Sequence, residues 1–315
     1  QSTAYNIAGG LRLRGQLSVA ALQGAFAQLQ ARHWALRTVF EDNGQQVLQR
    51  VIDDMPLAFT EVHLGQLPVD EREAQLTERV EQEAARTFDL ASGPLMRVCL
   101  LHLADDEWAL LLTLHHIIAD GASMKLLLDE LCIGYRAQLN GSSADLPVLP
   151  IQYAVWHRQW LDSGECERQL VHWTQHLGRE HPLLELPLDH PRPAQQSFRG
   201  DSLDFEIPVA VGQKLQQLAQ QNNCSLFMLL LTAFATLLYR YSGQRDLRIG
   251  LPIGGRQQQE TEGLVGFFVN TQVLRSQIDG EQSFNDLLAV TRNDVLDAQA
   301  HQNLPFEQLV EALQP

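Results

Sequence analysis

The spacing of apolar side chains predicts how the first part of the chain folds. Behind Ser18, apolar residues recur at a 3,4,3 spacing, which predicts an amphipathic helix with a serine at its N-cap. The short apolar runs 36–40 and 47–51 follow. They flank Asn43-Gly44, a dipeptide typical of the tight turn in a β-hairpin.

Longer patterns follow in the middle of the chain. A Glu-rich helix is expected over 70–87, and the apolar runs 95–103 and 108–116 predict two neighbouring strands. From Met124 the apolar spacing becomes helical. A further helix, rich in aromatic residues, is expected over 151–177.

A proline-rich stretch marks the expected boundary between two lobes. Four prolines fall within 181–200, which predicts an extended connector. We therefore expect an N-terminal lobe at 1–177 and a C-terminal lobe at 178–315. The second lobe is predicted to hold strands near 203–207, 246–253 and 265–275 and helices at 209–221, 226–241 and 284–300. Strands and helices are mixed in both lobes, so the predicted fold class is α/β, with the mixed sheets of an α+β protein.

Composition and charge limit the classes of partner. Of the 315 residues, 45% are hydrophobic and 19% charged, values typical of a folded protein with a sizeable core. The formal net charge of −15 argues against nucleic acid or an anionic membrane as partner, since both need a basic surface. No apolar run approaches the roughly 18 residues of a membrane span, and no signal-peptide core is evident. The four cysteines have neither metal nor disulfide spacing, which favours a reduced, cytoplasmic protein.

The segment Leu114–Ser123 carries the most informative chemistry. It reads LHHIIADGAS and lies where a buried strand is expected to give way to a helix. His115 and His116 point to opposite faces of a strand, so one is expected to face a core or a seam between lobes, and a histidine there is suited to act as a base near neutral pH. Asp120 is placed to orient the loop or cap the helix, and Gly121 allows close approach of a substrate. A core histidine followed by a capping aspartate fits the same short pattern.

Several further segments repeat a known set of motifs in order along the chain. They are RHWALRTVF at 32–40, FDLASGPL at 88–95, YAVW at 153–156, VGFFVNT at 265–271 and HQNLPFE at 301–307. Together with HHIIADG at 115–121, they resemble the condensation domains of non-ribosomal peptide synthetases, whose central motif is HHxxxDG. Ordered motifs over nearly the whole chain carry far more weight than one short pattern.

This resemblance implies two lobes, each similar to chloramphenicol acetyltransferase, that form a V-shaped pseudo-dimer. It implies an acyltransferase that joins a donor acyl or peptidyl thioester to the amine of an acceptor aminoacyl thioester. Both substrates are expected on the 4′-phosphopantetheine arms of donor and acceptor peptidyl carrier domains, beside an adenylation domain. A thioester is already activated, so no metal and no cofactor bound by the domain itself are expected.

The resemblance also implies roles for individual residues. His116 matches the histidine assigned to catalysis, either as general base for the amine or as the group that positions it. Gly121 is expected to offer a backbone N–H near the oxyanion. Asp120 matches a structural carboxylate paired with an arginine, for which we predict Arg256, and His115 is a further supporting residue.

Other candidates surround this motif. Asn270 and Ser123 are expected to lie along the substrate tunnel. Arg32 and Arg37 are interpreted as anchors of a buried ion-pair network, with substrate contact as the alternative.

A pair of histidines raises the question of a metal. His172 and His176 stand four residues apart on a predicted helix, a spacing that metal sites use. Since the sequence shows no clear third ligand, it favours a solvated helix face.

The chain departs from the family's pattern in places. Trp34 stands where the family has Glu, Ala122 replaces a bulkier residue, and Asn303 replaces Asp. The family's first motif is expected before Gln1 and its seventh after Pro315, so the second lobe is expected to be incomplete.

Several functions remain open from the sequence alone. The leading one is a condensation domain for an L-configured donor, a subtype that residues 117–119 favour. An epimerization domain keeps HHxxxDG but inverts an α-carbon, and the HQNLPFE segment favours condensation over it. A free-standing acyltransferase would use soluble acyl-CoA. A non-catalytic carrier-docking module, or an inactive fragment, would bind carriers without turnover.

Overall fold

The computed structural model describes residues 2–147, 153–195 and 200–314. Contacts among residues divide the chain into two compact units. Unit 1 comprises residues 1–151 and 256–268, and unit 2 comprises residues 152–255 and 269–315. The motif HHIIADG therefore lies in the same unit as Arg256, although the two are far apart in the sequence.

This division differs from the predicted boundary at residues 177 and 178. Helix α5 (Cys166–Leu177) precedes the proline-rich stretch, yet it packs against α10 (Phe306–Leu313) in unit 2. Trp173 is buried there, and its indole N–H donates a hydrogen bond to the carbonyl of His301 (2.9 Å). The apolar side chains of α5 thus decide where the helix belongs, while the prolines mark only an extended path.

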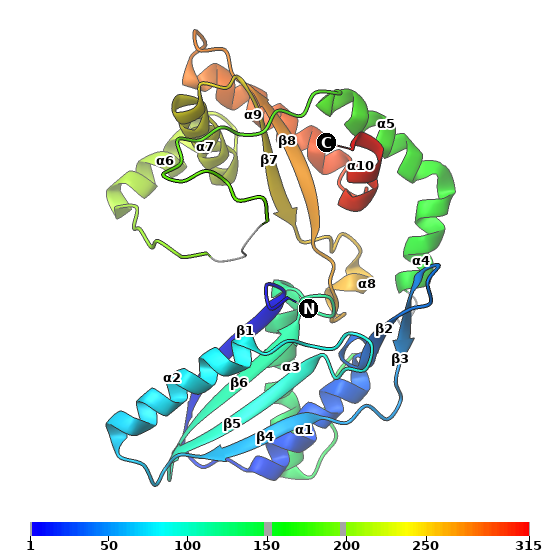
Figure 1. Cartoon of the computed structure of the whole chain (residues 1–315), viewed down its shortest axis with the longest axis vertical. Coiled ribbons are helices and arrows are strands. Elements are labelled where there is room, and N and C mark those ends of the chain that lie inside the picture. Colours follow the sequence, from blue (N-terminus) through cyan, green and yellow to red (C-terminus); the bar gives the residue numbers. More distant parts are fainter. Residues whose placement is uncertain (1, 148–152, 196–199, 315) are drawn as a thin grey trace. The chain divides into compact units, whose positions relative to one another are not determined.

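Unit 1 is built on a four-stranded sheet of order β1-β6-β5-β4 (Figure 1). Its strands are β1 (Asn6–Arg14), β4 (Ala58–His63), β5 (Met96–Ala104) and β6 (Glu107–His115). β6 pairs antiparallel with β1 and β5, whereas β4 runs parallel to β5. The other elements are α1 (Val19–Arg32), η1 (Trp34–Arg37), β2 (Thr38–Asp42), β3 (Val47–Val51), α2 (Val69–Ala85), α3 (Gly121–Asn140) and α8 (Gln259–Glu262).

Helices cover both faces of this sheet, which explains why β5 is apolar throughout. Met96 and Val98 join a core with α1 and α3, while Cys99 and Leu101 join a second core with Leu76 of α2. Alternate residues of a strand point to opposite faces, so a strand covered on both sides needs apolar residues at successive positions. β5 and β6 thereby form a rigid base that ends at the two histidines.

The local predictions for unit 1 are largely confirmed. The hydroxyl of Ser18 accepts a hydrogen bond from the N–H of Ala21 (3.3 Å), as expected of an N-cap. β2 and β3 form the hairpin expected around Asn43-Gly44. Leu36, expected at the start of the first strand, lies instead in the 3₁₀ turn η1 and is fully buried.

Unit 2 consists of helices around the antiparallel pair β7 (Asp246–Ile253) and β8 (Asn270–Gln277). Its helices are α4 (Tyr153–Trp160), the π-helical turn η2 (Leu161–Glu165), α5, α6 (Val209–Gln221), α7 (Leu226–Ser242), α9 (Phe284–Ala300) and α10. The mixed α/β class predicted for the chain is confirmed.

Three predictions for unit 2 are corrected. The aromatic helix is interrupted at η2, where Gly164 has a positive φ of 86°. Residues 203–207 form no strand; Leu203 and Phe205 are exposed (90% and 81%), and no strand among the described residues pairs with them. β8 begins at Asn270, later than expected, because residues 265–268 pack in unit 1.

The lengths and hydropathy of the helices bear on membrane crossing. Within the described ranges, no helix is by itself long and apolar enough to cross a membrane. α6 and α7 meet the length and composition criteria only together, as a pair bent by 104°.

Candidate functional site

The two histidines of the motif sit where β6 leaves the sheet. The backbone N–H of His115 donates to the carbonyl of Leu95 (3.0 Å), and that of His116 donates to the carbonyl of Tyr5 (2.7 Å). The neighbouring chain segments on both sides therefore fix the backbone of the motif. This anchoring defines the direction in which each imidazole leaves the strand.

His115 points into unit 1 and is held there. Its Nδ1 accepts a hydrogen bond from the N–H of Ile117 (3.1 Å), and its ring lies 6.0 Å from that of Phe88, edge to face. Burial and the neighbouring His116 lower the pKa of His115. The neutral imidazole with a lone pair on Nδ1 is thus the favoured form, which fits a supporting residue.

His116 has a different environment. Its ring is half-buried and stands nearly perpendicular to the ring of Phe267, with centroids 5.1 Å apart. Its Nδ1 is buried and has no hydrogen-bond partner among the described residues. No hydrogen bond or ion pair joins it to Asp120 within that part of the chain, so these two residues do not form a His–Asp relay.

Asp120 is buried and fully engaged elsewhere. It caps α3 by accepting hydrogen bonds from the N–H and the hydroxyl of Ser123 (both 2.8 Å). It also accepts from the N–H of Phe268 (3.1 Å) and from the guanidinium of Arg256 (3.0 and 3.3 Å). Burial by itself would raise the pKa of Asp120, but the hydrogen bonds from Ser123, Phe268 and Arg256 hold it below its ordinary value.

The structure thus brings Asp120 and Arg256 together, as expected from the resemblance. Arg256 also donates to the carbonyls of Thr261 and Leu264 (both 2.6 Å), and its guanidinium lies over the ring of Phe268, 4.1 Å from the centroid. These contacts tie the segment 256–268 to the start of α3. One buried arginine therefore organises a loop that is remote in sequence from the histidines.

Ser123 belongs to the same network. Its side chain is fully buried, its hydroxyl lies 2.9 Å from the carbonyl oxygen of Gly266, and it accepts from the N–H of Gly266 (3.1 Å) and from Arg256 (2.9 Å). The structure gives this hydroxyl no exposed wall, so its visible role is to join α3 to the loop. A tunnel role for Ser123 stays a prediction.

Gly121 is the first residue of α3 and is exposed. A methyl group added at its Cα would meet nothing within 4 Å. Its N–H has no hydrogen-bond partner among the described residues. The packing of the chain itself therefore does not require glycine here, and the space beside the N–H is open.

Asn270 lies in unit 2 at the start of β8. Its amide nitrogen donates to the carbonyls of Gln302 (3.2 Å) and Leu304 (2.7 Å), and its oxygen accepts from the N–H of Phe306 (3.0 Å). The side chain thus holds the HQNLPFE segment in place. The prediction that it contacts a substrate is not tested by these contacts.

Only one of the two N-terminal arginines joins a buried ion pair. Arg32 Nε contacts Glu130 of α3 (3.0 Å), and the same carboxylate lies 2.7 Å from His33 Nε2. Although burial opposes ionisation, His33 and Arg32 keep the pKa of Glu130 below its ordinary value. Arg37 pairs instead with Asp53 (3.1 Å), whose side chain is 95% exposed, so the buried network predicted for it is corrected.

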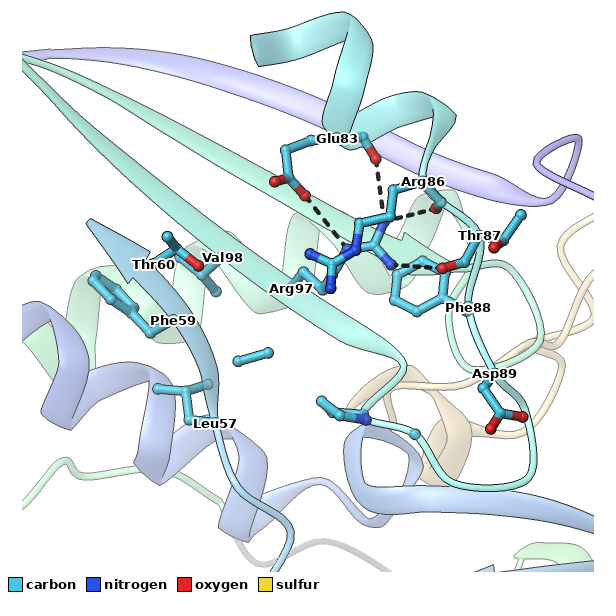
Figure 2. Close-up of a pocket in the computed structure, with 13 residues that line it drawn as sticks. Leu57, Phe59, Thr60, Glu83, Arg86, Thr87, Phe88, Asp89, Arg97 and Val98 are labelled. Carbon is cyan, nitrogen blue, oxygen red and sulfur yellow. Dashed lines mark hydrogen bonds and ion pairs between the residues drawn. The ribbon is translucent and has the colours of Figure 1, made fainter. Parts of the chain in front are cut away.

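A cavity of about 410 Å³ lies beside β4 and β5 in unit 1 (Figure 2). On its wall, Arg97 donates to the carbonyls of Glu83 (3.1 Å), Arg86 (2.9 Å) and Thr87 (3.3 Å). Its guanidinium also stacks on the ring of Phe88, 3.7 Å from the centroid. Burial and the nearby Arg86 lower the pKa of Arg97. This arginine therefore holds the end of α2 against β5, and its donors are already used by the protein.

Sequence reasoning missed two members of the site. Phe267, which packs on His116, and Phe268, whose N–H caps Asp120, appear in the sequence only as letters of the VGFFVNT segment. Their place after Arg256 in a motif was visible, but their contacts with the histidine motif were not. Those contacts depend on how a distant loop folds back.

The whole chain matches one family of known proteins. The sequence profile of the family described as "Condensation domain" matches residues 1–315. The chain belongs to that family.

Curated relatives of this condensation domain are peptide synthetases. A linear gramicidin synthase of Brevibacillus parabrevis is 41% identical over 316 residues, which cover 99% of this chain and 4% of the relative. Phosphinothricin tripeptide synthetase PhsC of Streptomyces viridochromogenes is 40% identical over 310 residues, covering 98% of this chain and 28% of the relative. The chain therefore spans only a small part of the curated relatives that it matches.

Solved structures agree on the fold. The X-domain from teicoplanin biosynthesis superposes with a TM-score of 0.90 at 29% identity, covering 98% of this chain and 69% of that one. A four-domain nonribosomal peptide synthetase bound to AMP and glycine gives a TM-score of 0.87 at 25% identity, covering 100% of this chain and 24% of that one. The chain thus has the condensation-domain fold.

Proposed function

We propose that this condensation domain forms an amide bond between a donor acyl or peptidyl thioester and the amine of an acceptor aminoacyl thioester. The observation that carries the proposal is the arrangement around His116. Its imidazole is half-buried and has an Nδ1 without a hydrogen-bond partner among the described residues, while the adjacent Asp120 is committed to Arg256. An imidazole that the protein does not use for its own packing is available to a substrate.

The chemistry asks little of the protein. The amine attacks the thioester carbonyl, a C–N bond forms, the C–S bond breaks, and the proton lost by the amine ends on the departing thiolate. His116 acts on the attacking amine, as its general base or by positioning it; a positioned acid–base group contributes roughly 10²–10⁴-fold. Holding both thioesters in line supplies further acceleration. The N–H of Gly121, which faces open space, is the proposed donor to the oxyanion.

The proposed donor is L-configured. Support comes from the motif residues 117–119, of which Ile118 and Ala119 are buried in the core and Ile117 is half-buried. Among these three residues, only Ile117 has a side chain placed to meet a substrate. Paired assays with L- and D-configured donor thioesters test this point, and equal rates for the two would contradict it.

The proposed partners are donor and acceptor carrier domains, each with a 4′-phosphopantetheine arm, and an adjacent adenylation domain. Support comes from the relatives, one of which is a four-domain nonribosomal peptide synthetase. The curated relatives are also much longer than this chain.

A single-turnover assay tests the function. Carrier domains loaded with donor and acceptor are mixed with the chain, and acyl transfer is followed by intact-protein mass spectrometry. We expect transfer to the acceptor carrier that falls at least about 100-fold in His116→Ala. Equal transfer from a soluble acyl-CoA would indicate a free-standing acyltransferase, and inversion of an α-carbon without transfer would indicate an epimerization domain.

A docking module is the second candidate. The observation that favours it is a solved complex of the X-domain and OxyB from teicoplanin biosynthesis, which matches this chain with a TM-score of 0.90 at 28% identity. On this alternative, the chain binds a partner equally well with and without His116 and transfers no acyl group. Carrier binding measured alongside the transfer assay separates the two functions.

A further inference from the structure

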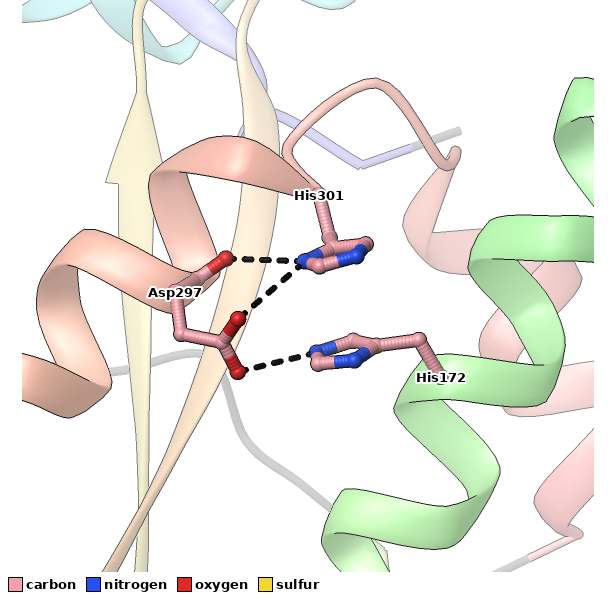
Figure 3. Close-up of side chains that lie close together, drawn as sticks. All are labelled: His172, Asp297 and His301. Atoms are coloured by element: carbon pink, nitrogen blue, oxygen red, sulfur yellow. Dashed lines mark hydrogen bonds and ion pairs between the residues drawn. The ribbon is translucent and has the colours of Figure 1, made fainter.

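A second group of histidines and carboxylates lies in unit 2, away from the motif in the sequence. His172 comes from α5, Asp297 from the last turns of α9, and His301 from the residue that ends α9 (Figure 3). The two imidazoles stack with centroids 3.5 Å apart and planes within 5° of each other. Figure 3 shows the carboxylate of Asp297 facing the nitrogen-bearing edges of both rings.

The spacing of these atoms fits ligands of one ion. His172 Nε2 lies 3.4 Å from one carboxylate oxygen of Asp297, and His301 Nδ1 lies 3.6 Å from the other. One ligand atom from each residue falls within 4.8 Å of the others. Tetrahedral zinc, with bonds of about 2.0–2.1 Å, spaces its ligand atoms by about 3.4 Å. The three side chains therefore need only small rotations to converge on an ion.

The state of the ligands also suits a metal. His172 and His301 are half-buried, and Asp297 is half-exposed, so the group is open to solvent on its carboxylate side. Burial and the neighbouring His301 lower the pKa of His172, which favours the neutral, metal-binding imidazole. His301 Nδ1 lies 2.9 Å from the backbone carbonyl of Asp297 in the metal-free chain. Coordination through Nδ1 moves its proton to Nε2.

We propose that His172, Asp297 and His301 form a binding site for a divalent transition metal of the zinc type, with water completing the coordination. Two imidazoles and a carboxylate are a donor set that zinc accepts. His176 lies one helical turn from His172, with ring centroids 6.0 Å apart, outside the compact group of three. The partner of His172 is thus not the histidine four residues on, but a pair of ligands far away in the sequence.

The proposed site joins two elements of unit 2. His172 is on α5, and the other two ligands lie at the end of α9, next to the HQNLPFE segment that Asn270 holds. A bound ion would cross-link these helices and stabilise the folded state, because the ligands converge only there.

The test is zinc binding by the whole chain without a histidine tag. Zn²⁺ affinity is measured by competition with a colorimetric chelator, and Co²⁺ absorption reports the coordination geometry. We expect one ion per chain and an increase of the melting temperature on adding Zn²⁺. Asp297→Asn and His172→Gln should each weaken binding at least about tenfold, and both variants should keep the melting temperature of the metal-free protein.

A matched control is available in unit 1. His63 and His102 lie with their Nδ1 atoms 3.4 Å apart, and Glu61 is 3.4 Å from His63. His63→Gln should leave Zn²⁺ binding unchanged. The proposal is overturned if His63→Gln removes binding, if Asp297→Asn and His172→Gln bind as tightly as the parent chain, or if the parent chain shows no binding at about 100 μM Zn²⁺, a concentration far above the dissociation constant of a built zinc site.

Discussion

Histidine and aspartate meet at two places in this protein, with opposite outcomes. In unit 1, Asp120 stands four residues after His116, yet its carboxylate is 1% exposed and is taken up by Arg256, Ser123 and the N–H of Phe268. In unit 2, Asp297 is distant in sequence from His172, yet its half-exposed carboxylate faces two imidazoles.

The difference lies in what each carboxylate does for the fold. A buried carboxylate must be paired, and its partners then define the loop around it. An exposed carboxylate contributes little to folding and is free to meet a ligand. The comparison assigns Asp120 to the structure of the site, His116 to its chemistry, and Asp297 to neither until an ion is present.

The largest expected effect separates the two aspartates by stability. Asp120→Ala leaves Arg256 buried without its carboxylate and removes the cap of α3, so we expect a loss of about 3–5 kcal/mol in the free energy of unfolding. Asp297→Ala should cost less than about 1 kcal/mol in metal-free buffer. Urea unfolding of both variants measures the difference; equal losses would remove the distinction.

Ser123→Ala tests how far the network extends beyond the charged pair. The substitution leaves the N–H of Gly266 and part of Arg256 without their acceptor in a fully buried place, and we expect a loss of about 1–3 kcal/mol. Ser163→Ala is the control, since its hydroxyl makes an exposed hydrogen bond to the nearby carbonyl of Trp160. If both variants lose the same small amount, the buried network contributes no more than a surface hydroxyl does.

His115 should show itself in the pH dependence of stability. Burial lowers its pKa in the folded state, so its stabilising contribution is present above the unfolded value of about 6.5 and is lost as pH falls through the folded pKa. In His115→Asn, whose amide oxygen replaces the Nδ1 acceptor, this loss of about 1 kcal/mol should vanish. Urea unfolding at a series of pH values on both sides of the unfolded pKa measures it, and an unchanged pH profile would mean that His115 does not titrate in this way.

Gly121→Ala should change stability least. The added methyl group meets nothing within 4 Å, so the free energy of unfolding should stay within about 0.5 kcal/mol or rise slightly. The transfer rate should nevertheless fall about tenfold, since the methyl group occupies the space proposed for the oxyanion. An unchanged rate in the single-turnover assay would remove Gly121 from the site.

Much of unit 1 could be predicted because its signals are local. Ser18 caps its own helix, Asn43-Gly44 turns its own hairpin, and the apolar runs at 95–103 and 108–116 form neighbouring strands. The partner of Asp120 was predictable only from the resemblance, since Arg256 lies 136 residues away. The failures share one cause. The contacts of α5 with unit 2, the lack of a described strand at 203–207 and the meeting of His172 with Asp297 all depend on distant segments, which no local pattern encodes.

The most direct test of the account is one substitution with two readouts. His116→Ala removes an imidazole that has no hydrogen-bond partner for its buried Nδ1 among the described residues. The account predicts that the rate of acyl transfer between loaded carrier domains falls at least about 100-fold, while the free energy of unfolding changes by less than about 1 kcal/mol. A transfer rate equal to that of the parent chain, or a loss of rate matched by unfolding, would contradict it.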